Sequence, residues 1–143
     1  MFLMTLTLNK KNLYNQEFGL NDGSTSPPSA IPSYIESSQL SIGDGEDFVF
    51  LSRLIPDITF DASVSTTPTV NMTLQTRNYP GGHYLQTNAS AVTQSATTPV
   101  EQFTNEAYIR LRGRAFALKI DSSMTDIQWR LGSPRVDVRP DGR

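Results

Sequence analysis

The chain contains no cysteine and only one histidine, His83. Without cysteine it has no disulfide framework and no thiolate zinc site, and a single histidine excludes a metal site built on a histidine pair. A domain of 143 residues must therefore depend on packing or on assembly with other chains. The formal net charge is only -2, which argues against a surface built overall to coat nucleic acid.

Helical patterns and long apolar runs are also missing. No segment approaches the length of a membrane span, and none longer than a short turn has the period of an amphipathic helix. The opening residues MFLMTLTLNKK lack the charge order and cleavage site of a secretion signal. No glycine-rich loop opens a helix, so we expect no cofactor. Abundant Thr, Ser and Asn instead favour an all-β protein.

One strand is clearly marked. Residues 69–77, TVNMTLQTR, alternate so that Val70, Met72 and Leu74 share one face, as in a half-buried strand of an antiparallel sheet. Residues 85–99 are rich in Thr, Ser and Ala, and they predict an exposed loop or a weak edge hairpin.

Two further hairpins are predicted from turn residues. Residues 34–42 and 47–60 flank Gly-Asp-Gly-Glu, and Pro56 is expected to end or bend the second strand. Residues 127–131 and 135–139 flank Gly-Ser-Pro and predict a closing hairpin. About seven short strands favour an antiparallel β-sandwich or small barrel.

The first 32 residues differ from the rest and predict an extended arm or linker, followed by a β domain over residues 33–143. Pro27 and Pro28 interrupt regular structure near the end of this segment. Its opening alternates apolar and polar side chains, which suits a strand that pairs with a neighbour. The candidate interface residues of this arm are Phe2, Met4, Leu6 and Leu8.

The most distinctive segment is AYIRLRGRAFALKI, residues 107–120. Its apolar side chains occupy odd positions up to Leu111 and even positions from Phe116 onward. Because side chains alternate with a period of two, this change of parity requires a bulge or sharp bend at Gly113. We expect Phe116 and Trp129 to lie in the core. Three arginines crowd the polar side of the bend, Arg110, Arg112 and Arg114.

These arginines have three possible roles. They could pair with phosphates of DNA, with carboxylates of a neighbouring subunit, or with carboxylates across the sheet. Pairing across the sheet is the simplest explanation, because aspartates are interleaved with arginines over the last third of the chain. These aspartates are Asp121, Asp126, Asp137 and Asp141, and the other nearby arginines are Arg130, Arg135, Arg139 and Arg143.

Two other groups of residues are candidates for a metal site and for a catalytic site. The carboxylates of Asp44, Glu46 and Asp47 have the density that calcium prefers, but the spacing of an EF-hand is missing and turn formation explains the same residues. His83 offers one general base without a recognisable nucleophile motif, so we expect no catalytic site.

Four segments, in this order, resemble the C-terminal region of large virion structural proteins of tailed bacteriophages. They are IESSQLSIGDGEDFVFLSRLIPDITF (35–60), VNMTLQTRNYPGG (70–82), IRLRGRAFALKI (109–120) and WRLGSPRVDVRPDGR (129–143). Among these proteins, the tail nozzle or tail tubular protein of short-tailed phages is the best match, over about residues 34–143. One departure is Ala115, where the family pattern has a polar residue.

The resemblance implies a virion tail component without catalytic residues. It implies a homo-oligomeric ring of this chain with other phage tail subunits, around a conduit through which DNA passes. It further implies a C-terminal piece of a longer tail protein or a separately encoded version. Two alternatives remain open: a host-surface module that binds a carbohydrate or receptor through Tyr79, His83 and Tyr84, and a hydrolase of the host envelope.

Overall fold

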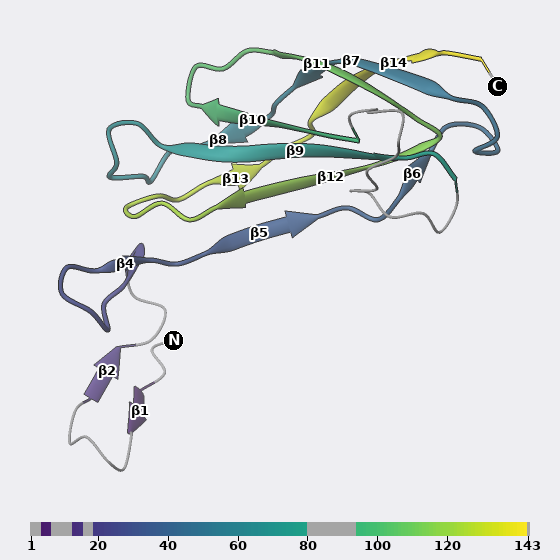
Figure 1. Ribbon diagram of the computed structural model, residues 1–143. Helices are drawn as coiled ribbons and strands as arrows, with labels where there is room; N and C mark the ends of the chain where they lie inside the picture. Colours follow the sequence, from purple (N-terminus) through teal and green to yellow (C-terminus); the bar gives the residue numbers. More distant parts are fainter. Residues whose placement is uncertain (1–3, 7–12, 16–18, 80–93, 143) are drawn as a thin grey trace.

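The computed structural model describes residues 4–6, 13–15, 19–79 and 94–142, and those residues contain strands but no helix. The all-β prediction is confirmed. The strands, shown in Figure 1, are β1 (Met4–Leu6), β2 (Leu13–Asn15), β3 (Asn21–Asp22), β4 (Ser29–Ala30), β5 (Ser33–Glu36), β6 (Leu40–Ser41), β7 (Val49–Ile55), β8 (Ile58–Thr59), β9 (Thr69–Arg77), β10 (Ser95–Glu101), β11 (Ala107–Gly113), β12 (Ala115–Ser122), β13 (Arg130–Leu131) and β14 (Arg135–Pro140).

Two antiparallel sheets form a sandwich. The larger sheet has the order β10-β9-β12-β5, with β6 also paired to β12, and the smaller sheet has the order β11-β7-β14. The inward side chains of both sheets form one apolar core, as expected when two amphipathic sheets stack face to face. Its buried members are Leu51, Leu54, Phe60, Val70, Met72, Leu74, Val100, Ala107, Ile109, Leu111, Phe116 and Ile120.

Strand β9 follows its sequence pattern. Val70, Met72 and Leu74 are buried, whereas Asn71 is exposed, so the alternation predicted for residues 69–77 is confirmed. β9 lies between β10 and β12. Of residues 85–99, predicted as an exposed loop or a weak edge hairpin, residues 95–99 begin the edge strand β10, which pairs with β9, and residues 80–93 lie outside the described part of the chain.

The parity change marks the place where the chain passes from one sheet to the other. β11 belongs to the smaller sheet and β12 to the larger, and Arg114 is the bend between them. A bend is therefore correct, but residues 107–120 form two strands instead of one bulged strand. A separate register shift interrupts the pairing of β11 with β7 between Tyr108 and Leu111.

The predicted hairpin of residues 34–42 with 47–60 is wrong. β5 and β6 pair with β12 in one sheet, whereas β7 pairs with β11 and β14 in the other. Gly43 and Gly45 do form a turn, with φ values of 63° and 77° that favour glycine. This turn, however, connects strands of two different sheets. Pro56 does follow the last residue of β7, as expected.

The closing hairpin is also wrong. β13 pairs with β8 and β14 pairs with β7, so residues 130–140 run antiparallel to residues 49–59, with an interruption at residues 132–134 and a register shift between Asp137 and Val138. At the interruption, Gly132 N donates to Asp57 O at 2.7 Å and Ser133 N donates to the Asp57 carboxylate at 2.6 Å. The Gly-Ser-Pro segment is therefore not a hairpin turn. It links β13 to β14 along the same partner segment and is held to Asp57 between the two pairings.

Phe116 is buried in the core, as predicted. Trp129 is half-buried and packs against the core, and its indole Nε1 donates to Ser33 Oγ at 3.0 Å. Before β5, the hairpin β3-β4 is joined to the sandwich by Asn21. Asn21 Nδ2 donates to Asp126 Oδ1 at 2.7 Å, and Asp126 N donates to Asn21 Oδ1 at 2.6 Å.

Candidate interaction surfaces

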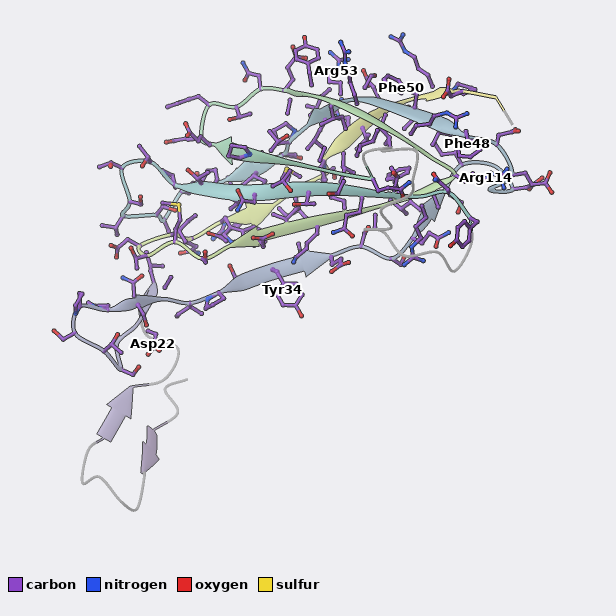
Figure 2. All side chains as sticks on the ribbon, in the orientation of Figure 1. Asp22, Tyr34, Phe48, Phe50, Arg53 and Arg114 are labelled. Carbon is purple, nitrogen blue, oxygen red and sulfur yellow. The ribbon has the colours of Figure 1, made fainter. Side chains whose placement is uncertain are left out.

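The bend between the two sheets gathers two of the three predicted arginines around one aromatic ring. The guanidinium carbons of Arg112 and Arg114 lie 3.9 Å and 4.8 Å from the centroid of Phe48, which precedes β7. Figure 2 labels Phe48 and Arg114 at this end of the sandwich. An arginine over an aromatic face gains cation-π attraction. The three side chains thus connect the β11-β12 bend to the start of β7.

Gly113 permits the close approach of this bend to β9. A Cβ at Gly113 would lie 2.6 Å from the Cβ of Thr76 and 3.0 Å from the carbonyl of Arg77. Arg114 N donates to that same carbonyl at 2.7 Å, and the buried Thr76 hydroxyl donates to the carbonyl of Arg112 at 3.2 Å. The absence of a side chain at Gly113 therefore allows the backbone of the bend to pack closely against β9.

Arg112 also forms an ion pair with Asp141, just after β14. Both side chains are 44% exposed, so the pair is screened by water and contributes at most about 1 kcal/mol. This is the kind of intrachain charge pairing that the interleaved aspartates suggested. Arg114 has no ion pair within the described residues, and its Nε is buried there without a hydrogen-bond partner.

The outer face of the smaller sheet carries a second charged group. Arg53 on β7 lies between Glu106, at 3.0 Å, and Asp137 on β14, at 2.7 Å. The Tyr108 hydroxyl donates to Glu106 at 2.8 Å. This bond and the one from Arg53 lower the pKa of Glu106, while the Glu106 carboxylate raises the pKa values of Tyr108 and Arg53.

Two other arginines on this face are exposed. Arg110 on β11 and Arg139 on β14 each border a shallow hollow that includes Ser52 and Tyr108. Neither has an ion pair within residues 19–79 and 94–142. The three arginines expected together therefore divide: Arg112 and Arg114 adjoin Phe48, and Arg110 faces outward with Arg139.

Of the other predicted partners, Asp126 hydrogen-bonds to Asn21 instead of an arginine. Asp121 lies on β12 opposite Asn71 and has no ion pair within the part of the chain that is described.

The N-terminal candidates are only partly described. Met4 and Leu6 bound strand β1, which pairs with β2 alone, while Phe2 and Leu8 lie outside the described residues. In Figure 1 this small hairpin lies apart from the sandwich, beyond β4.

A surface that the sequence did not reveal lies along β5 and β6. Five of the nine exposed large hydrophobic side chains of the described residues fall within residues 31–42, which makes this edge a candidate contact surface. They are Ile31, Tyr34, Ile35, Leu40 and Ile42. The sequence places Ile31 in the N-terminal arm and residues 34–42 in a hairpin strand, and only the sheet order of the described residues shows that these side chains lie on one uncovered edge.

The remaining candidates are the acidic turn after β6 and the aromatic residues that follow β9. Asp44, Glu46 and Asp47 lie in the exposed connection between β6 and β7, and no group of three or more potential ligands in the described segments could hold a metal ion. Tyr79 is half-exposed after β9, whereas His83 and Tyr84 lie outside the described residues.

The chain matches no model of a known protein family, and a search of curated proteins finds no relative. The described residues contain no helix long and apolar enough to cross a membrane.

Proposed function

We propose that this chain is a non-enzymatic structural component of a bacteriophage tail, of the nozzle or tubular type, that assembles with copies of itself and with other tail subunits into a ring. The observation that carries the proposal is the apolar edge of the sandwich at residues 31–42, joined to the four-segment resemblance. An edge strand with uncovered apolar side chains is a surface for another chain.

Such a component works through shape and contact area. A ring of identical subunits needs one surface on each copy that fits a different surface on the next. The sandwich supplies a stiff body for this purpose, because its core is shared by both sheets and the β11-β12 segment joins them directly.

In such a ring, we assign the outer face of the smaller sheet, which carries the exposed Arg110 and Arg139, to the side that DNA passes. Arg110 and Arg139 supply positive charge there, and guanidinium groups pair with phosphates in a salt-dependent way. Filter binding of duplex DNA by the full chain tests this assignment. Replacing both arginines with alanine should abolish the binding, whereas undiminished binding by the double variant refutes the assignment.

Virion fractionation tests the main proposal. Purified particles of the phage that encodes this chain are separated into tails and capsids, and each fraction is blotted with an antibody raised against the sandwich. We expect a band in the tail fraction, and its size distinguishes a separate gene product from the end of a longer protein.

Absence from virions refutes the proposal. Binding of the isolated chain to host cells or to a glycan array, lost on replacement of Tyr79, would then support a host-surface module.

A further inference from the structure

Two of the three exposed apolar side chains of β5 and β6, those of Ile35 and Leu40, belong to the inner face of the sandwich, whereas Tyr34, which pairs with Asp121, belongs to the outer face. Ile35 pairs with Ile120, and Leu40 pairs with Phe116. Directly paired residues of neighbouring strands point to the same face of a sheet, and both partners are core residues. Ile35 and Leu40 nevertheless remain 48% and 45% exposed.

Among the described residues, the strand that should cover them is missing. There, the larger sheet has four positions and the smaller one only three, ending at β14. β5 and β6 therefore extend beyond the strands that should face them. One further strand beside β14 would cover both side chains, and the free edge of β14 offers backbone groups to pair with it.

Two hollows lie where this strand would run. One borders the end of β6 and is lined by residues of the β6-β7 connection and of the smaller sheet, including Ile42, Val138 and Pro140. The other borders the start of β5 and includes Ile31, Ile127 and Trp129. The uncovered strip thus has apolar hollows at both ends.

The chain also contains a hairpin that pairs with nothing else. β1 and β2 pair only with each other among the described strands, and an isolated two-stranded hairpin is marginally stable in water. Its first strand comes from the alternating apolar sequence that begins the chain. Asn21 holds the following segment to the sandwich through Asp126, and the hairpin lies beyond that point, away from its own uncovered strip (Figure 1).

We propose that the β1-β2 hairpin of a second copy adds to the free edge of β14 and covers Ile35 and Leu40. The contact joins two different surfaces, so it can repeat from copy to copy and close a ring. It deepens the proposed function, on which it rests, by assigning the contact between neighbouring subunits.

Disulfide trapping tests the contact, and the absence of native cysteine makes every introduced thiol unique. A full chain carrying Met4→Cys is mixed with a full chain carrying Ile35→Cys under mild oxidation. We expect a disulfide-linked heterodimer. The matched control replaces Ile35→Cys by Phe103→Cys, an apolar residue that is 86% exposed in the β10-β11 connection, and should give no such product.

Two results would overturn the proposal. One is equal cross-linking of the Phe103 control. The other is a chain carrying both Met4→Cys and Ile35→Cys that cross-links only within itself at every concentration, because its own hairpin would then fill the strip.

Sedimentation of the full chain gives an independent readout. Ile35→Ser and Leu40→Ser should each weaken self-association roughly fivefold, since each side chain still has about half its surface to bury. The controls Phe103→Ser and Val64→Ser should leave it unchanged. Association insensitive to both edge substitutions, or no association, refutes the contact, whereas a chain that cross-links as expected but is absent from tails refutes only the proposed function.

Discussion

Replacing Gly113 with alanine should destabilise the sandwich at the bend between its sheets. The added Cβ would lie 2.6 Å from the Cβ of Thr76, and Thr76 is fully buried, so neither atom has room to move away. The carbonyl of Arg77, at 3.0 Å, blocks the other direction and already accepts the amide of Arg114. The clash of the added Cβ can therefore be relieved only if the backbones of β9 and β11 move apart.

Overpacking of this kind typically costs about 1–3 kcal/mol of unfolding free energy. Urea or guanidinium titration of the Gly113→Ala variant measures it directly. The matched control is Gly23→Ala, since a Cβ at Gly23 meets nothing within 4 Å and its φ is not positive. The control should change stability by less than about 1 kcal/mol. A Gly113→Ala variant as stable as the control would refute the close-packing argument.

Three further predictions concern neighbouring residues. Arg112→Met should lower the unfolding free energy by about 1 kcal/mol at low salt, through loss of its ion pair and its contact with Phe48, and by less at high salt; Arg110→Met should have no such effect. The pKa of Glu106 is lowered below its ordinary value of 4.5 in the folded protein. The ionised Glu106 carboxylate therefore stabilises the fold above pH 4.5, and this stabilisation is lost as the pH falls through the pKa of the folded state. The stability difference between wild type and Glu106→Gln should therefore vanish in acid, and a difference that persists there would contradict the assignment. Thr76→Val should cost about 1 kcal/mol in thermal unfolding, and no loss would show that its buried hydroxyl contributes nothing.

Alternation of side chains predicted the fold best where one strand lies in the middle of a sheet. β9 has neighbours on both sides and one buried face, so buried and less buried residues alternate along its whole length. The parity change before Phe116 was equally informative, because a period of two cannot shift without a bend in the backbone.

The hairpin predictions failed because turn residues describe only the local path of the chain. Gly43 and Gly45 adopt the left-handed conformation that their sequence suggested, yet the strands on either side belong to different sheets. Nothing in a turn specifies which distant strand completes the ladder. β6 and β7 find their partners more than fifty residues away, on β11, β12 and β14.

By itself, the sequence determined the strand-forming character of the chain, the alternation of β9 and a bend next to Gly113, because each follows from backbone geometry over a few residues. The tertiary structure alone decided which sheet each strand joins, that Arg112 meets Asp141 while Arg110 faces outward, and that no strand of the described residues covers Ile35 and Leu40. These properties depend on contacts between residues far apart in the chain. Periodicity shows which side chains share a face, but only the number of strands in the opposite sheet decides whether that face is buried.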